Sequence, residues 1–253
     1  MITVCLSFDD GRSDSYSTAF KILSGYGLKA SFHIVTGFVD GTFKQECFGV
    51  GRKPVTINNL LEMHGAGMDV SSHGNDHVME TKDFHLSVKK LKRWGVAKKK
   101  YGFSVPNSRY EEKDLRKFVD KTKDMLEYVR VGRSYKCKSF LNKMMFVLYH
   151  YFHWYWCFKH FNKQNIIHVF DKFKIVSLVV KKHTRLKDLS RFIDSYKNDD
   201  CYLVIMLHSI TESPSNEWEW DRNSFDALCS FLSGDCKNIK VDTIEAVVNG
   251  LGE

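Results

Sequence analysis

The stretch ITVCLSFDDG, residues 2–11, is a run of apolar and β-branched residues that ends in two adjacent carboxylates, Asp9 and Asp10. Such a run predicts a buried strand, and on a regular strand neighbouring side chains point to opposite faces. Both aspartates can share one site only where the strand ends, and Gly11 is the residue type that frees the backbone there. The stretch therefore predicts a polar site at the carboxyl end of a buried strand.

Similar short runs recur along the chain with amphipathic helical patterns between them. We expect strands over 2–8, 30–36, 68–72, 101–105, 128–131, 175–180, 202–207 and 239–241. Strands that alternate with helices predict an α/β fold with a parallel sheet, most economically a closed or nearly closed barrel. The length suits one domain spanning residues 1–253. In such folds, chemistry gathers at the carboxyl ends of the strands, a rim where several polar residues are expected to converge.

Charge and cysteine content limit the classes of partner. The formal net charge is +8, but the basic residues are scattered and no zinc-finger spacing, basic heptad region or RNA-binding strand pattern occurs. We therefore expect no nucleic-acid partner. The seven cysteines include no Cys-x-x-Cys pair, and the first residues already read as a strand rather than a signal peptide. These features favour reduced thiols and a cytoplasmic location.

One segment interrupts the alternation. Residues 138–163 are rich in aromatic side chains, and we expect a helical insertion there. Its apolar part is shorter than the about 20 residues that span a bilayer. One interpretation is a helix or helix pair buried against the barrel. The other is a peripheral membrane contact through residues 140–161, or a subunit contact. The sequence leaves the oligomeric state open.

The stretch SSHGNDHV, residues 71–78, carries two histidines four positions apart, His73 and His77. Two imidazoles joined by a carboxylate from a neighbouring strand suit zinc or another divalent first-row ion. His208 directly follows another apolar run and is either a structural residue or a proton donor opposite the metal. Together these groups could add metal-activated water to a carbonyl and then release an amine or alcohol.

Ordered motifs across most of the chain resemble those of the polysaccharide deacetylases of carbohydrate esterase family 4, the NodB-homology family. The matching stretches are SFDDG, KASFHI, EMHGAGMDVSSHGNDH, FSVPNSRY, VIMLHS and FDALCSFLSGDCKNIKVDTIEAVV. The resemblance implies a distorted (β/α)7 barrel, which is related to the TIM barrel. It also implies an enzyme that removes N- or O-acetyl groups from a carbohydrate. It also implies a divalent ion, usually zinc and sometimes cobalt or nickel.

The resemblance assigns roles to the residues of the predicted site. It implies that Asp9 is the general base and that His208 is the general acid. It implies that Asp10 binds the metal together with His73 and His77. Of the two adjacent aspartates, one is then expected to hold the ion and the other to stay off it and accept a proton.

The third motif of the family departs from its usual form here. Pro106 and Asn107 match it, and Asn107 stands where a backbone N–H helps to hold the oxyanion. The motif usually begins with an arginine that orients the base, but Ser104 occupies that position. Arg109 and Arg133 are the candidates to replace the arginine.

The fourth motif, an Asp and a Trp near the sixth strand, has no visible counterpart around KIVSLVVKKHT, residues 174–184. Trp218 and Trp220 are candidates to line the acetyl pocket instead, or they cap the barrel. The resemblance thus favours a sugar deacetylase. The free thiols, basic charge and aromatic insertion further suggest an intracellular substrate, a glycan precursor of envelope or capsular polysaccharide assembly. The alternatives are a deformylase or other amide hydrolase on the same barrel, and a catalytically weak member that binds glycan or membrane.

Overall fold

The sheet of this protein is parallel over most of its width and strongly curled. The computed structural model describes residues 1–43, 53–108, 110–132, 140–234 and 238–251. Five strands lie side by side and parallel in chain order: β1 (Ile2–Phe8), β2 (Ser31–Ile34), β3 (Asp69–Ser72), β4 (Tyr101–Ser104) and β5 (Leu126–Arg130). On the other side, β8 (Cys201–Leu207) pairs with β1 from Ile2 opposite Cys201 to Phe8 opposite Leu207.

The chain segment from Ile175 to β7 (Leu178–Val179) closes the ring. β7 lies parallel to β8, and an isolated parallel bridge joins Ile175 to Arg130 at the end of β5. Around this bridge, the Val131 N–H donates to the Ile175 carbonyl at 2.8 Å, and the Ile175 N–H donates to the Val129 carbonyl at 2.9 Å. We call this junction of residues 129–131 with Ile175 the barrel seam. Seven parallel strands therefore form a distorted (β/α)7 barrel, as expected from the sequence.

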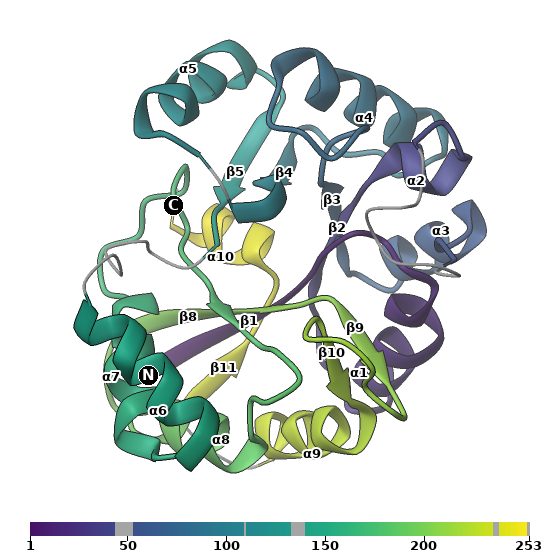
Figure 1. Ribbon diagram of the computed structural model, residues 1–253. Helices are drawn as coiled ribbons and strands as arrows, with labels where there is room; N and C mark the ends of the chain where they lie inside the picture. The colour runs from purple at the N-terminus through teal and green to yellow at the C-terminus, as the bar shows by residue number, and fades with distance from the viewer. Residues whose placement is uncertain (44–52, 109, 133–139, 235–237, 252–253) are drawn as a thin grey trace.

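Helices cover the outside of the barrel (Figure 1). They are η1 (Ser15–Phe20), α1 (Lys21–Gly25), α2 (Thr36–Asp40), α3 (Ile57–Gly65), α4 (Thr81–Arg93), α5 (Glu112–Thr122), α6 (Phe140–Phe152), α7 (Tyr155–Asn162), α8 (Leu186–Asp194), α9 (Arg222–Ser233) and α10 (Ile244–Gly250). Side-chain caps begin several of them, such as the reciprocal Thr56–Asn59 capping box of α3. Every residue of β1 is buried, as is typical of a parallel strand covered on both faces.

Several short strands were not predicted. β6 (Ile166–Ile167) runs antiparallel to β8, and β9 (Ser209–Thr211) pairs with β10 (Glu219–Asp221) in a separate two-stranded sheet. Strands of two or three residues are too short to leave a periodic pattern. β11 (Ile239–Val241) was predicted. It pairs with the first half of β1, whereas β2 pairs with the last residues of β1.

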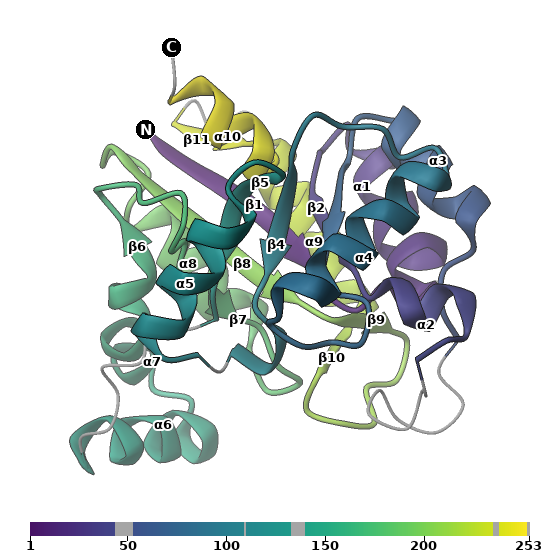
Figure 2. The ribbon, with the colours of Figure 1, turned by 90° about the horizontal axis from the view of Figure 1, so that it is seen from above.

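The aromatic-rich segment forms α6 and α7, which come between β5 and β7. Figure 2 shows α6 projecting beyond the barrel. Cys157 and Phe158 of α7 are buried, and the Phe158 ring meets the ring of Phe192 in α8 edge to face. Among the described residues, no helix is both long enough and apolar enough to cross a membrane.

Candidate active site

The two adjacent aspartates reach one site because the chain leaves the strand conformation directly after β1. Asp10 has φ of 76° and Gly11 has φ of 77°, so the turn begins at Asp10, one residue before the expected position. The Asp9 N–H still donates to the Leu207 carbonyl of β8 at 3.1 Å. Both carboxylates are buried. A left-handed conformation at an aspartate is uncommon, and it marks this turn as a constrained position.

Asp9 is held by an arginine that the sequence reasoning missed. The fully buried Arg130, at the end of β5, places Nη2 2.7 Å from Asp9 Oδ1 and also contacts Oδ2. Ser104 lies at the same carboxylate, with Oγ 3.3 Å from Asp9 Oδ1. Arg109 and Arg133, the two arginines proposed from the sequence, lie outside the described residues. The available signal was a lone arginine inside the apolar run YVRV, residues 128–131.

The charges around Asp9 keep it ionised. Burial raises the pKa of its carboxyl, but the guanidinium of Arg130 outweighs burial and holds the pKa well below its usual range. Asp9 is therefore a carboxylate at every physiological pH. It is also fixed in orientation by its ion pair with Arg130.

Asp10, His73 and His77 form a triangle of possible metal ligands, with ligand atoms all within 4.8 Å of one another. His73 Nε2 lies 3.2 Å from His77 Nε2 and 3.6 Å from Asp10 Oδ1, and His77 Nε2 lies 4.0 Å from that oxygen. Ligands of a tetrahedral zinc ion, at about 2.0–2.2 Å from it, lie roughly 3.3–3.6 Å apart. The triangle thus fits a divalent first-row cation with one side open.

The chemical state of these groups also suits a metal. His73 Nδ1 is 2.9 Å from the Ser104 carbonyl, which can only accept, so Nδ1 carries the hydrogen and the Nε2 lone pair faces the triangle. Burial lowers the pKa of both His73 and His77, which keeps both rings neutral. Arg12 donates from Nε to Asp10 Oδ2 at 2.9 Å, leaving Oδ1 directed at the histidines. Burial, with the nearby charge of Asp9, raises the pKa of Asp10 to about 6 despite Arg12.

The loop that carries both histidines is fastened by α4. Asp83 in the first turn of α4 accepts hydrogen bonds from the backbone N–H groups of Asn75 and Asp76, each at 2.8 Å. These bonds hold a backbone in which His77 has φ of 56° and Gly74 has φ of 85°. A Cβ atom at Gly74 would lie 2.3 Å from Asp83 Oδ2, so only glycine fits there. Neither Asp83 nor Arg12 was singled out by the sequence reasoning.

His208 follows β8 and lies on the same rim. Burial lowers the pKa of its imidazole to about 4, although the charge of Asp9 opposes this shift. Its Nδ1 atom is buried and has no hydrogen-bond partner within the described part of the chain. No Asp of the fourth motif was found in the sequence, and among the described residues no carboxylate lies within hydrogen-bond distance of this nitrogen.

The remaining predicted residues differ in placement. Pro106 and Asn107 form the turn after β4, with Asn107 exposed and at φ of 54°. The Trp218 ring lies 4.8 Å from the His208 ring, at the site. Trp220 was a candidate for the pocket wall, but it is 2% exposed, packs in the core and donates from Nε1 to the Thr184 carbonyl at 2.8 Å. Its placement is structural, because the pairing of β9 with β10 turns this side chain inward.

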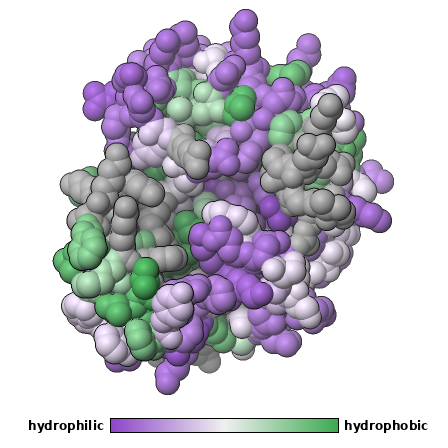
Figure 3. Space-filling view, viewed as in Figure 1, coloured by the Kyte–Doolittle hydropathy of each residue, from purple (hydrophilic) through white to green (hydrophobic). Residues whose placement is uncertain are grey.

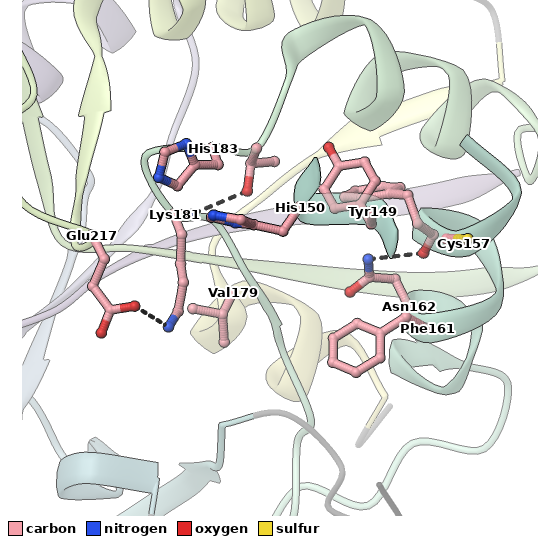
Figure 4. Close-up of a pocket in the computed structure, with 11 residues that line it drawn as sticks. Tyr149, His150, Cys157, Phe161, Asn162, Val179, Lys181, His183 and Glu217 are labelled. Carbon is pink, nitrogen blue, oxygen red and sulfur yellow. Dashed lines mark hydrogen bonds and ion pairs between the residues drawn. The ribbon is translucent and has the colours of Figure 1, made fainter. Parts of the chain in front are cut away.

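A largely apolar cavity of about 160 Å³ opens between α6–α7 and the loop after β7 (Figure 4). Lys181 forms an ion pair with Glu217 at 2.7 Å on its wall, and the Lys181 ammonium also lies 4.4 Å from the Trp218 ring centre. Because Trp218 contacts His208, the cavity adjoins the candidate catalytic rim, the end of the barrel that carries Asp9, Asp10 and His208. Its other lining residues are Tyr149, His150, Cys157, Phe158, Phe161, Asn162, Val179, His183 and Thr184.

A buried polar chain runs down the barrel interior from Asp9. His33 Nδ1 lies 3.7 Å from Asp9 Oδ1 and accepts a hydrogen bond from the Ser7 hydroxyl at 3.2 Å, and its Nε2 lies 3.0 Å from the Tyr128 hydroxyl. Tyr128 donates to Asp69 Oδ2 at 2.5 Å, and Asp69 Oδ1 pairs with Lys98 Nζ at 2.6 Å. Because the Tyr128 hydroxyl hydrogen points to Asp69, His33 donates from Nε2 to the Tyr128 oxygen. Each polar group of this chain thus has a partner inside the barrel.

A curled parallel barrel with this rim defines a class of protein. The family model of polysaccharide deacetylase matches residues 2–133, and the chain belongs to this family. The putative polysaccharide deacetylase YxkH of Bacillus subtilis (strain 168) is 30% identical over 76 residues. That match spans 30% of this chain and 23% of the relative's length.

Solved structures share the fold. A family 4 acetyl xylan esterase from Clostridium thermocellum, in complex with cobalt, has a TM-score of 0.55 at 14% identity, covering 99% of this chain and 92% of the other. The peptidoglycan N-acetylglucosamine deacetylase Bc1960 has a TM-score of 0.52 at 14% identity, covering 97% of this chain and 91% of the other. At such identities the likeness concerns the fold.

Proposed function

We propose that this protein is a metal-dependent hydrolase that removes an acetyl group, as N-acetyl, from a carbohydrate. The observation that carries the proposal is the convergence of the Asp10–His73–His77 triangle with the arginine-held carboxylate of Asp9. Family membership supports the reaction class. Among the structures of the same fold, one is a peptidoglycan N-acetylglucosamine deacetylase and another is an acetyl xylan esterase in complex with cobalt.

The proposed mechanism assigns one task to each group. A divalent cation held by Asp10, His73 and His77 would supply a Lewis acid for activating water and for neutralising charge on the carbonyl oxygen. Asp9 takes a proton from the attacking water, and Arg130 holds the Asp9 carboxylate in a fixed orientation. We propose the backbone N–H of Asn107 as an oxyanion donor and Trp218 as a wall of the acetyl pocket.

His208 is proposed as the acid that protonates the leaving amine. Its pKa of about 4 makes it neutral in the unliganded site, so it takes up a proton from solvent only when negative charge develops beside it, and Asp9 returns the proton of the attacking water to solvent. The tetrahedral oxyanion is such a charge. Zinc is the proposed metal because it suits two imidazoles and one carboxylate, while cobalt and nickel suit the same ligands.

A second candidate function is binding without efficient turnover. The unpartnered Nδ1 of His208 favours it, because an imidazole with no carboxylate behind it is a weaker and less well oriented acid. A deformylase reaction would use the same groups, and the release of formate instead of acetate distinguishes it.

The test combines metal analysis with release of acetate and formate. Acetylated and formylated amino sugars are supplied free, as polymers and attached to lipid, with and without a chelator and added Zn²⁺. We expect chelation to abolish release and Zn²⁺ to restore it. The Asp10→Ala variant should lose both metal and activity, whereas Asp9→Asn should keep the metal and lose activity by about 100-fold or more. Acetate release that survives both Asp9→Asn and His208→Ala would refute the mechanism.

A further inference from the structure

The face of α6 that points away from the barrel is apolar. Met145 is buried on the opposite face, and Tyr149 packs against the core. A helix on the surface of a soluble domain normally carries polar residues on its outer face. The outward residues here recur at helical spacing, and we call them the α6 stripe: Phe140, Leu141, Met144, Val147 and Tyr151. Phe140 is 83% exposed and Tyr151 is 73% exposed, so the described part of the chain leaves most of the surface of these two side chains uncovered.

The stripe continues into exposed aromatic residues. Phe152 and Trp154 stack with ring centres 5.3 Å apart, and Trp156 is 63% exposed. Figure 3 shows hydrophobic side chains gathered over α6 and α7 at the lower left of this face. Contiguous apolar surface of this kind marks an interaction site rather than ordinary surface. Tryptophan and tyrosine are the residues that favour the polar–apolar boundary of a membrane.

The charge of the segment selects its partner. From Ser139 to Lys163 the sequence holds three lysines and no Asp or Glu. A second copy bound across a two-fold axis would bring this segment against itself, and the segment contributes three lysines but no carboxylate of its own to pair with them. An anionic lipid surface supplies both the apolar layer and the opposite charge.

The surface and the catalytic rim lie on the same side of the barrel. The insertion follows the carboxyl end of β5, where Arg130 meets Asp9. It is fastened to the start of α8, since Arg185 donates to the His153 carbonyl at 2.6 Å. Figure 2 shows α6 beyond the end of the barrel at which β9 and β10 also lie, the strands that follow His208. The apolar cavity of Figure 4 lies between the insertion and the rim.

We propose that the α6 stripe, with Phe152, Trp154 and Trp156, docks this protein on an anionic membrane surface. The helix lies in the headgroup layer and the catalytic rim faces glycans attached to that surface. The docking stands on the exposure, charge and placement of α6–α7, whereas the assignment of surface-attached glycans as substrates rests on the proposed deacetylase function.

Vesicle sedimentation of the full chain tests the docking without turnover. We expect binding to vesicles of equal phosphatidylcholine and phosphatidylglycerol, weaker binding to phosphatidylcholine alone, and weakening by salt. The double variant Val147→Glu/Tyr151→Glu should bind the anionic vesicles about tenfold more weakly or worse, because two charges enter the apolar contact. Leu86→Glu is the matched control, since Leu86 is an exposed apolar residue of the outer α4 helix, and it should bind as the parent does.

Two further measurements separate the possible failures. Brominated phosphatidylcholine in the anionic vesicles should quench the tryptophan fluorescence of the parent protein. A Trp154→Ser/Trp156→Ser variant should lose that quenching. Turnover of a soluble acetylated sugar should be equal in the parent and the stripe variant, while turnover of a vesicle-bound acetylated glycolipid should fall in the variant. Absence of binding to anionic vesicles at low salt would overturn the docking. So would a dimer in solution that the stripe variant converts to monomer.

Discussion

At the scale of single residues, Arg130 is the group on which the candidate base depends. It is fully buried, pairs with Asp9 and also contacts Ser104. In the Arg130→Met variant, the carboxylate of Asp9 is no longer held in its orientation, and its negative charge is left buried without the ion pair. We expect kcat/KM for acetate release to fall by about 100-fold or more. The free energy of unfolding should fall by about 3–5 kcal/mol.

The matched control is Arg109→Met, at one of the two arginines that the sequence alone suggested. It should keep most of the activity, and metal content should stay at the parent level in both variants. If Arg109→Met loses as much activity as Arg130→Met, then Arg130 is not the residue that orients the Asp9 carboxylate. Acetate release, metal analysis and denaturant unfolding decide the matter.

His33 makes the stability of the protein depend on pH. Burial, with the charge of Arg130, lowers its pKa from 6.5 to about 4, while Asp9 and Asp69 oppose the shift. The unfolded chain therefore takes up a proton at a higher pH than the folded protein does. Stability from this residue is fully present above pH 6.5 and falls as the pH drops toward about 4. The loss amounts to about 3 kcal/mol at most.

We expect the His33→Phe variant to unfold with a weaker pH dependence over that window. Denaturant unfolding of the parent and the variant at a series of pH values measures the difference. If the free energy of unfolding changes with pH to the same extent in both proteins, His33 is not the source of this pH dependence. Tyr128 should keep its hydrogen bond to Asp69 in the variant, so the rest of the polar chain is preserved.

At the scale of elements, the start of α4 sets the geometry of the metal-ligand loop. Asp83 binds the backbone N–H groups of Asn75 and Asp76, between the two histidines. In Asp83→Ala the loop is free to relax from the left-handed conformation of His77. We expect metal affinity to fall by about 10- to 100-fold, the range found when groups behind metal ligands are removed.

Asp114→Ala is the control for this loop, because Asp114 also lies in the first turn of a helix, α5, but is exposed. It should leave metal affinity unchanged. Titration of the chelated protein with Zn²⁺ measures both variants. Equal affinities for Asp83→Ala and the parent would show that the loop keeps its shape without α4.

At the scale of the whole molecule, the compactness of the barrel shields its thiols. Burial raises the pKa of Cys229 to about 12 and that of Cys201 to about 11, and it raises the pKa of Cys5 further. The thiolate is the reactive form, so these residues should resist iodoacetamide in the native protein near neutral pH. Peptide mapping should find them modified only after unfolding. Rapid native modification of Cys5 would contradict the closed barrel.

The sequence was sufficient to predict the barrel and most of its rim, because buried strands followed by polar residues leave a strong local pattern. Asp10, His73 and His77 were expected together, and the structure brings them together. Arg130 was missed because it pairs with Asp9 across 121 positions, and no local pattern records such a pair. The sequence left open whether Trp220 lines the pocket or caps the barrel, because a two-stranded sheet of very short strands decides which way it faces.

The barrel seam links the motion of the fold to the state of the base. Arg130 belongs to the bridge that joins β5 to Ile175, so a transient opening of this junction displaces the guanidinium that holds Asp9. The Ile175 and Val131 amides donate across the seam, and deuterium exchange at these two positions counts such openings. We expect them to exchange faster than the β1 amides that β8 covers along its full length. The exchange rate at Ile175 then reports the fraction of time during which the seam is open and the base is out of position.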